Sequence, residues 1–269
     1  VLIDIPKDVG LEEFENYTPV RQKDVVQQKG YRFQYKTKRW QIKQALKMIK
    51  QASQPLLYVG GGAITSNAAD ELLELVDLFQ IPITSTLMGK GSISNSHKLA
   101  LGMLGMHGTA YANFSVSECD LLIAVGARFD DRVTGKLDDF ACHAQVIHID
   151  IDPAEISKNR IPQLALVGDV KKILQEILKE QVYDSSIDLE QTMPWRKRIT
   201  RWKQTYPLIV PSSNTTLSPQ EVITTVNNIA KNAFFTTDVG QHQMWSAQFL
   251  QCDARQWASS AGLGTMGYG

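Results

Sequence analysis

Residues 102–135 read GMLGMHGTAYANFSVSECDLLIAVGARFDDRVTG, a pattern of small residues, an apolar run and a charged turn. The apolar run extends from Leu121 to Val125 and ends on Gly126. Such a run is typical of a strand that is buried on both faces of a parallel sheet. Four charged side chains follow between Arg128 and Arg132. Because α/β proteins bind ligands at the carboxyl ends of parallel strands, we expect a ligand site at this turn.

A second turn of small residues, Gly105–Gly108, lies upstream and precedes a predicted helix over 109–116. Another unit begins with the predicted strand Pro55–Val59, which runs into three consecutive glycines, Gly60–Gly62. Glycines let a backbone approach a ligand without a clash at Cβ. A tight turn without a ligand would use the same residues, so both interpretations stay open. The next predicted strand is Ile81–Thr86.

Two further predicted strands end near carboxylates. The strand Gln145–Asp150 ends on a carboxylate that suits the hydroxyl groups of a ribose. An Asp-Pro turn or a helix cap is the alternative, because Asp152-Pro153 follows directly. The other strand ends at Val167–Asp169, and Asp169 is the predicted N-cap of a helix. The apolar positions of that helix are Val170, Ile173, Leu174, Ile177 and Leu178.

Strands alternate with helices from about residue 35 to about residue 180. One helix begins near Gln41, and Asn67 is the predicted cap of another. Their apolar positions are Ile42, Ala45, Leu46 and Ile49 in the first, and Leu72, Leu73, Val76 and Phe79 in the second. This alternation predicts the α/β class with a doubly wound parallel sheet. Several strand-end turns gathered at one edge would favour a nucleotide-type cofactor.

The polar residues 181–193 predict a linker, and a helix is predicted from Pro194. One stripe of this helix is aromatic and apolar, and the opposite face is basic. We favour an interdomain helix with a solvated basic face over a helix that lies on a membrane, because the charges of the chain balance. The stripe consists of Trp195, Ile199, Trp202 and Tyr206, and the basic face of Arg196, Lys197, Arg198, Arg201 and Lys203.

A second α/β domain is predicted from about residue 211. Ser218–Glu221 combines an N-cap serine, a proline at the first helical position and a capping-box glutamate. The apolar positions of the helix are Val222, Ile223, Val226 and Ile229. A predicted strand, Ala233–Val239, runs into Gly240–Trp245, and Ser260–Gly269 is a glycine-rich loop whose backbone can press against a bound group.

The bulk composition of the chain argues against two classes of function, nucleic-acid binding and membrane insertion. Lysine plus arginine and aspartate plus glutamate number 28 each, which argues against nucleic-acid binding through bulk charge. No apolar run approaches the length of a membrane span. The three cysteines, Cys119, Cys142 and Cys252, are expected to be buried hydrophobes in a reducing compartment, and His143 and His148 to be structural. We expect a piece of a longer protein, because the chain lacks an initiator methionine and stops in a glycine-rich run.

Taken together, several long motifs resemble the catalytic large subunit of the acetohydroxyacid synthase (acetolactate synthase) family, which uses thiamine diphosphate. The resemblance extends over the whole chain. The motifs, in chain order, are VLIDIPKDV, YVGGGAI, LGMHGTAYAN, AVGARFDDRVTGK, HIDIDPAEI, LVGD, TDVGQHQMW and SAGLGTMGYG. LGMHG and GARFDDRVTG set this family apart from most other thiamine-diphosphate enzymes.

The resemblance implies α/β domains in a fixed order along the chain. Residues 1–20 would be the tail of a pyrimidine-binding domain and a linker, and 21–180 a complete central FAD-binding domain. Residues 181–210 would be a linker and helix, and 211–269 the start of a thiamine-diphosphate-binding domain.

The resemblance also implies cofactor contacts. FAD would be contacted by Gly60, Gly61, Gly62, Thr86, Leu87, Met88, Leu104, Gly105, Met106, His107, Gly108, Gly126, Ala127, Arg128, Asp130, Arg132, Val133, Asp150, Ile151, Gly168, Asp169 and Val170. Thiamine diphosphate would be contacted by Val239, Gly240, Gln241, His242, Gly264 and Met266. The substrate channel would be lined by Lys7, Met106, Asp131 and Arg132, since a cationic side chain suits the carboxylate of a 2-oxo acid.

In the family, the catalytic glutamate lies upstream of Val1 and the Mg²⁺ ligands lie downstream of Gly269. We therefore assign no catalytic residue and no metal ligand to this chain, and expect it to be inactive alone. The implied enzyme is a transferase that decarboxylates pyruvate and transfers the two-carbon unit to a second 2-oxo acid, giving 2-acetolactate or 2-aceto-2-hydroxybutyrate for isoleucine, valine and leucine synthesis. Pyruvate oxidase, glyoxylate carboligase and a non-catalytic FAD-binding module are the alternatives.

The resemblance finally implies partners and a place in the cell. We expect a homodimer or larger assembly with a small regulatory subunit, in a plastid stroma or a bacterial cytoplasm. Neither nucleic acid nor membrane is expected as a partner.

Overall fold

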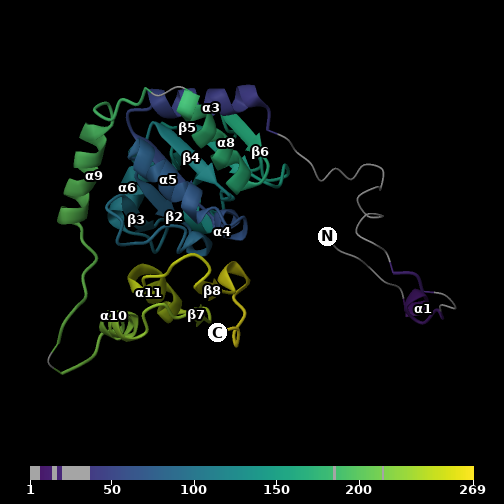
Figure 1. Cartoon of the computed structure of the whole chain (residues 1–269). Coiled ribbons are helices and arrows are strands. Elements are labelled where there is room, and N and C mark those ends of the chain that lie inside the picture. Colours follow the sequence, from purple (N-terminus) through teal and green to yellow (C-terminus); the bar gives the residue numbers. More distant parts are fainter. Residues whose placement is uncertain (1–6, 14–16, 20–36, 184–185, 214) are drawn as a thin grey trace. The chain divides into compact units, whose positions relative to one another are not determined.

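The computed structural model describes residues 7–13, 17–19, 37–183, 186–213 and 215–269. It divides into two units, residues 1–35 and 36–269. The described part of the first unit contains one short helix, α1 (Lys7–Gly10). The sequence also predicts a short strand at Val1–Ile5, which lies outside the described residues. All other elements belong to the second unit (Figure 1).

A six-stranded sheet, parallel throughout, forms the centre of the second unit. Its order is β3-β2-β1-β4-β5-β6, so the chain builds outward from β1 in one direction and then returns to continue from β4. This is the strand order of doubly wound dinucleotide-binding folds. The strands are β1 (Pro55–Val59), β2 (Ile83–Ser85), β3 (Ala100–Met103), β4 (Leu121–Val125), β5 (Gln145–Asp150) and β6 (Leu164–Val167).

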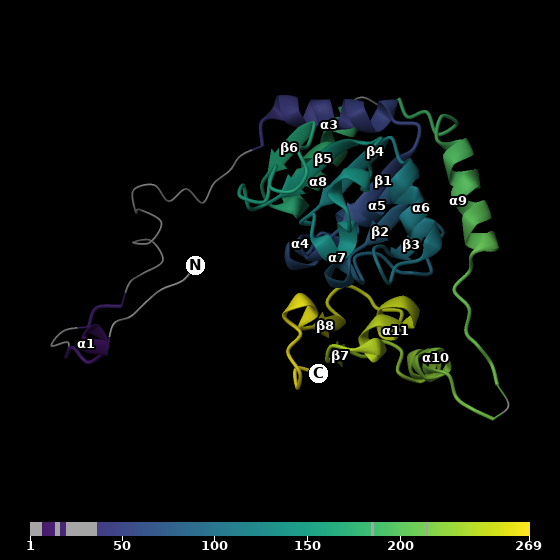
Figure 2. The same cartoon turned by 180° about the vertical axis from the view of Figure 1, so that it is seen from behind.

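Helices pack on both faces of this sheet, as the two sides in Figures 1 and 2 show. Buried side chains of α3 (Arg39–Gln51), α5 (Ala69–Phe79) and α8 (Val170–Tyr183) belong to one core cluster. Those of α6 (Ala110–Glu118) and α9 (Met193–Thr205) belong to the other. The predicted doubly wound α/β fold is therefore confirmed.

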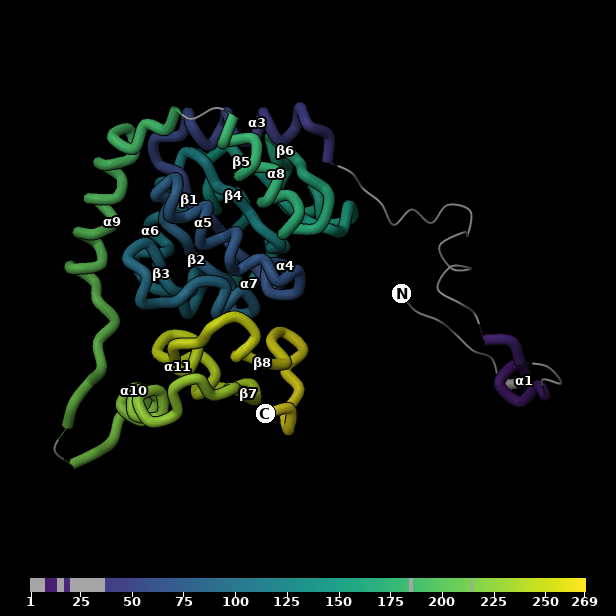
Figure 3. The backbone as a smooth tube through the Cα atoms, viewed as in Figure 1, coloured from purple at the N-terminus to yellow at the C-terminus, as the bar shows by residue number. Residues whose placement is uncertain are grey.

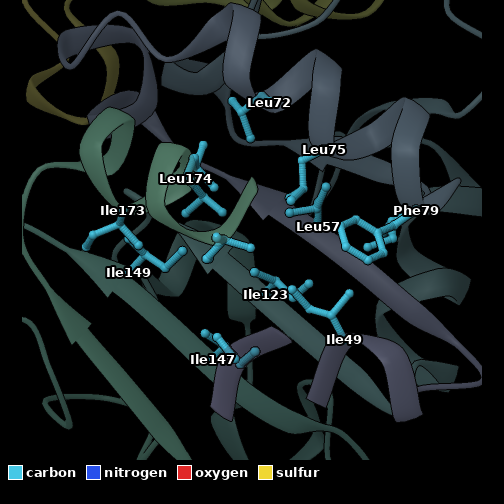
Figure 4. Packing of buried hydrophobic residues seen from close by; sticks show 14 of the residues in the cluster. Ile49, Leu57, Leu72, Leu75, Phe79, Ile123, Ile147, Ile149, Ile173 and Leu174 are labelled. Atoms are coloured by element: carbon cyan, nitrogen blue, oxygen red, sulfur yellow. The ribbon is translucent and has the colours of Figure 1, made fainter. Parts of the chain in front are cut away.

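The two clusters divide the residues of each central strand between them. In β1, Leu57 and Val59 pack into the first cluster, and Leu56 and Tyr58 into the second. This alternation follows from the two-residue period of a strand, and it explains why the strand sequence is apolar throughout. Figure 4 shows the first cluster, where Leu57 lies between the sheet and the α5 side chains Leu75 and Phe79.

A smaller α/β part follows α9 along the chain, as the trace in Figure 3 shows. It contains α10 (Pro219–Ile229), β7 (Phe235–Thr237), α11 (Gln241–Phe249), β8 (Trp257–Ser259) and the short helix η3 (Ala261–Leu263). β7 and β8 pair in parallel, so their carboxyl ends lie at the same edge. The predicted capping box of α10 is present, with Ser218 and Glu221 bonding each other's backbone N–H groups.

Three sequence predictions are wrong. Asn67 does not cap α5, because it adopts a left-handed backbone (φ 56°) and Ala68 is the N-cap. The apolar face of α5 includes Leu75 rather than Leu73, which is 42% exposed. Cys142 is exposed, whereas Cys119 and Cys252 are buried as predicted.

Several elements were not predicted, among them β3, β8 and α11. β3 has only four residues and contains Gly102 in a left-handed conformation, so its sequence carries little strand signal. The predicted strand Ala233–Val239 is shorter than expected, since β7 covers three residues.

Candidate cofactor site

The predicted contact residues of the central domain lie at one edge of the sheet. Because all six strands are parallel, the turns that follow them gather at their carboxyl ends. The chain order reverses between β1 and β4, and a crevice for a ligand is expected at such a point. The two turns at this point are Gly60–Gly62 and Gly126–Asp130.

These two turns are in backbone contact. The Gly60 N–H donates to the Val125 carbonyl, and the Gly62 N–H donates to the Gly126 carbonyl, both at 3.0 Å. A Cβ at Gly60 would lie 2.3 Å from the Gly126 oxygen. Gly126 has φ +57°, and a Cβ there would lie 2.7 Å from the backbone nitrogen of Ala63. Neither position accepts a side chain, so glycine is needed for packing whether or not a ligand binds.

The turn after β4 is held by hydrogen bonds from two buried side chains, His148 and Tyr58, and from the exposed side chain of Asn159. Nε2 of His148, in β5, lies 3.1 Å from the Ala127 carbonyl oxygen, and the Tyr58 hydroxyl donates to the Arg128 carbonyl at 3.4 Å. The amide of Asn159 donates to the Phe129 carbonyl at 2.6 Å. The turn is therefore fixed at three successive carbonyl groups.

The His148 side chain, which contacts the Ala127 carbonyl, is completely buried. Burial lowers the pKa of the His148 imidazole, although the nearby carboxylates of Asp150 and Glu155 and the Ala127 carbonyl oppose the shift. A neutral imidazole in this position donates from Nε2 to Ala127, which leaves Nδ1 as an acceptor. Nδ1 finds no hydrogen-bond partner within the described ranges. The expectation that His148 is structural is confirmed, whereas His143 is exposed.

The charged side chains of the same turn face solvent. Arg128 and Asp130 form an ion pair of 3.3 Å, with 65% and 38% of their side chains exposed. Asp130 also accepts the Arg132 N–H at 3.1 Å and so caps α7 (Asp131–Thr134). Asp131 and Arg132 are exposed. These groups are therefore accessible to a ligand at the carboxyl edge.

The turns after β2 and β3 present exposed apolar side chains. Met88 is 44% exposed and Met106 is 77% exposed. The Thr86 hydroxyl accepts the Gly89 N–H at 3.0 Å, which closes the turn after β2. The turn after β3 is closed by Asn113, whose amide bonds both the N–H and the carbonyl of Gly105.

The acidic residues at the carboxyl ends of β5 and β6 accept hydrogen bonds from the turns that follow these strands. One oxygen of Asp150 accepts the Asp152 N–H at 2.9 Å, which is the turn that the sequence offered as an alternative. Its second oxygen lies 4.0 Å from Nε2 of His148, and the role of Asp150 toward a ribose stays a prediction. Asp169 accepts the Lys172 N–H at 3.1 Å and caps α8 as predicted. Ile151 is 64% exposed at this edge.

Three predicted contact residues direct their side chains into the core. Leu104, Ala127 and Val170 are each at most 3% exposed. They can offer a ligand only backbone atoms.

A second edge lies at the carboxyl ends of β7 and β8. Asp238 follows β7 and accepts the N–H groups of Gly267, Tyr268 and Gly269 at 3.0, 2.7 and 2.8 Å. These backbone donors lower the pKa of the Asp238 carboxyl group. Asp238 therefore holds the glycine-rich loop beside the start of α11, where Gly240 is the N-cap.

This edge combines predicted contacts from two distant segments. Val239–His242 comes from the start of α11, and Gly264 and Met266 come from the loop. A Cβ at Gly264 would meet nothing within 4 Å, and Met266 is 68% exposed. Within the core of this part, the Gln243 amide donates to the Ser259 hydroxyl at 2.5 Å and so links α11 to β8.

Two family models match the chain. The model described as thiamine pyrophosphate enzyme, central domain, matches residues 42–177. The model described as thiamine pyrophosphate enzyme, C-terminal TPP binding domain, matches residues 238–269. The chain belongs to the thiamine pyrophosphate enzymes. The finer division predicted from the sequence, at residues 20, 180 and 210, stays a prediction.

Proteins named acetolactate synthase resemble the chain over its entire length. The acetolactate synthase large subunit of Porphyra purpurea is 61% identical over 269 residues, which are 100% of this chain and 45% of that protein. The acetolactate synthase large subunit of Parasynechococcus marenigrum is 53% identical, with 43% of that protein covered. The acetolactate synthase of Mycobacterium bovis is 45% identical over 271 residues. The chain thus spans about 45% of the length of these relatives.

The residues at the two edges fit the cofactors expected of such a thiamine pyrophosphate enzyme. The start of a helix offers backbone N–H groups to a diphosphate, and Gln241 and His242 are exposed there. At the larger edge, glycine turns, Arg128 and the exposed Met88 suit the phosphates and rings of a dinucleotide. The described ranges hold no group of three or more metal-binding side chains, and we assign no metal ligand.

Two surface hollows lie away from these edges. One, of about 330 Å³, is lined by six residues of α9 alone, including Arg196, Lys197 and Arg201. The other, of about 570 Å³, is lined by five residues of α5. Because each is lined by one helix face, neither brings groups from different elements together, and we assign no binding role to them.

The predicted channel residues are divided between the two units. Lys7 belongs to α1 in the first unit, whereas Met106, Asp131 and Arg132 belong to the second. Sequence reasoning also missed Asp238 as a residue that organises the site. Its signal was available, because Asp238 follows a strand in the same way as Asp150 does.

Proposed function

We propose that this chain is part of the catalytic large subunit of an acetolactate synthase. The whole enzyme would decarboxylate pyruvate and transfer the two-carbon unit to a second 2-oxo acid, giving 2-acetolactate or 2-aceto-2-hydroxybutyrate for branched-chain amino-acid synthesis. The single strongest support is the 61% identity to acetolactate synthase large subunits over all 269 residues. Thiamine diphosphate would supply the electron sink for the decarboxylation.

FAD is the proposed ligand of the larger edge, and thiamine diphosphate with Mg²⁺ that of the smaller edge. The proposal for FAD is supported by the strand order and by the two glycine turns at the point where the order reverses. The proposal for thiamine diphosphate is supported by the match at residues 238–269 and by the loop that Asp238 holds. The Mg²⁺ ligands would come from a part of the protein outside this chain.

Substrate binding would use the exposed cationic group of Arg132 near Met106. Their turns touch, since a Cβ at Gly105 would lie 3.0 Å from the Arg132 carbonyl oxygen. A guanidinium group matches the geometry of the carboxylate of a 2-oxo acid.

The assembly and its location are also proposals. The words "large subunit" in the relatives' names support a small regulatory partner, and we propose a homodimer or larger assembly of the large subunit. The relatives from Porphyra and Parasynechococcus support a plastid stroma or a bacterial cytoplasm. No helix in the described part of the chain is long and apolar enough to cross a membrane.

Acetolactate formation from pyruvate by the complete gene product tests the proposal. We expect activity that requires added thiamine diphosphate and Mg²⁺, and a visible flavin absorption that does not change during turnover. Residues 1–269 expressed alone should form no acetolactate. Pyruvate-dependent hydrogen peroxide without acetolactate would favour a pyruvate oxidase. Bound FAD with neither product would favour a non-catalytic flavin-binding module.

A further inference from the structure

A buried lysine joins the two parts of the second unit. Lys90 follows the short helix η1 (Leu87–Gly89) and is only 5% exposed. Its ammonium group donates to the carbonyl oxygens of Ala247 at 2.9 Å and Leu250 at 2.6 Å. These carbonyls lie at the carboxyl end of α11, where helical carbonyl groups lack partners within the helix. Lys90 therefore caps a helix that is 157 residues away in the sequence.

The charge of Lys90 is costly in this position. Burial lowers its pKa to about 8, and the neighbouring Cys252 opposes the shift. The ammonium also lies 5.8 Å from the centre of the Trp257 ring, within range of a cation–π interaction. An apolar side chain would fill this space without the cost of burying a charge. An amine that has lost its proton keeps two N–H groups, so the bonds to Ala247 and Leu250 can form in either charge state.

Other contacts join the same two segments, residues 87–95 and residues 247–257, which we call the joint. A Cβ at Gly91 would lie 2.5 Å from the Asp253 carbonyl oxygen, so the two segments meet at backbone distance. The amide of Asn95 donates to the Leu250 carbonyl at 3.4 Å. Leu87 packs against the small core formed by Leu250, Cys252 and Trp257.

The joint connects the two predicted cofactor sites. On one side, Lys90 follows directly on the turn of Thr86–Gly89, whose first residues are predicted flavin contacts. On the other side it holds one end of α11, and the opposite end begins at Gly240. A helix of nine residues is a stiff rod of about 13 Å, so fixing its carboxyl end limits how its first turn can tilt.

We propose that Lys90 is a positioning residue that anchors α11 to the turn after β2 and thereby holds Gly240–His242 in place to bind thiamine diphosphate. The proposal rests on the proposed function, which assigns those residues to that cofactor. Lys90 itself touches neither reacting atoms nor cofactor in this scheme.

The test compares three variants of the complete gene product. Lys90→Met keeps the length and apolar volume of the side chain but removes its donors. Lys90→Arg keeps the donors. Lys47→Met, on the exposed face of α3, is the matched control. The readout is the dissociation constant of thiamine diphosphate with Mg²⁺, from quenching of tryptophan fluorescence, together with the flavin absorption per protein and the melting temperature.

We expect Lys90→Met to raise the dissociation constant about tenfold or more, because two hydrogen bonds to a buried cation are lost. Lys90→Arg should stay within about threefold of the unmodified protein because it keeps N–H donors for the two carbonyl groups, and Lys47→Met should match the unmodified protein. Flavin content should not change in any variant, and the pyruvate KM of Lys90→Met at saturating thiamine diphosphate should not change either.

An unchanged affinity of Lys90→Met for thiamine diphosphate would overturn the role of Lys90. So would a loss of affinity in Lys90→Arg that equals the loss in Lys90→Met. If Lys90→Met does not fold, Lys90→Gln carries the test, because it removes the charge and shortens the reach; its dissociation constant should also rise. An unmodified protein that does not bind thiamine diphosphate at all would overturn the proposed function, and this inference with it.

Discussion

The six-stranded sheet and the two-stranded sheet both carry predicted cofactor contacts at their carboxyl edges, yet different interactions stabilise them. The larger sheet buries apolar side chains on both faces, in two clusters. The smaller sheet has three residues in each strand, and α10 beside it has no buried residue among those described. Within the described part of the chain, the buried members of its core cluster are Leu250, Cys252 and Trp257.

Polar contacts take a larger part in the smaller region. Asp238 binds three backbone N–H groups, Gln243 binds Ser259, and Lys90 binds the end of α11. Such contacts are directional, whereas apolar burial is not. A short sheet with a small core thus obtains its geometry from a few specific hydrogen bonds. We expect substitutions to act accordingly in the two regions.

The largest effect is expected in the core of the larger sheet. Leu72→Ala removes a completely buried side chain of α5, and should cost about 2–5 kcal/mol of unfolding free energy through lost burial and the remaining cavity. Leu73→Ala, the next residue on the same helix but 42% exposed, should cost less than about 1 kcal/mol. Hydrogen exchange of the slowest amides of β1 and β4 measures the unfolding free energy of both variants. Equal losses would contradict the assignment of Leu72 to the core.

Two glycines with left-handed backbones allow the regions to be compared directly. Gly126→Ala should cost about 2–3 kcal/mol, because backbone strain adds to a clash with Ala63. Gly264→Ala has similar strain but open space around its Cβ, and should cost about 1 kcal/mol. Urea unfolding of the complete gene product without added cofactor measures the difference.

The same pair should separate the two cofactors. Gly126→Ala should reduce the flavin content, because it displaces the turn after β4. Gly264→Ala should weaken thiamine diphosphate binding and leave the flavin content unchanged. A loss of flavin in Gly264→Ala would contradict the separation of the two sites.

A smaller effect is expected at the start of α10. Ser218→Ala removes a hydroxyl that accepts the Glu221 N–H at 3.2 Å, and should lower the local stability of the helix by about 1 kcal/mol. Ser117→Ala is the control, since that exposed hydroxyl bonds only to a carbonyl of its own helix, at Asn113. Amide exchange in the first turn of α10 measures the loss. Unchanged exchange would mean that the capping box does not stabilise α10.

Local sequence patterns were sufficient to predict most strands of the larger sheet. The apolar runs at Pro55–Val59 and Leu121–Val125 predict buried strands because a strand covered on both faces has no polar side. The capping residues Asp169 and Ser218 were also predictable, because a cap acts within four residues of chain. Together with motifs such as GARFDDRVTG, these patterns also indicated the family.

Only the tertiary structure decided which distant residues meet. The contact of Gly60 with Gly126, the support of Ala127 by His148 and the capping of α11 by Lys90 join residues that are 21 to 157 positions apart. No periodicity encodes such pairs, because they depend on the order of strands in the sheet and on how the segments pack. A lysine in a turn is ordinarily solvated, so nothing in the local sequence of Lys90 reveals that its amine is buried against another part of the chain.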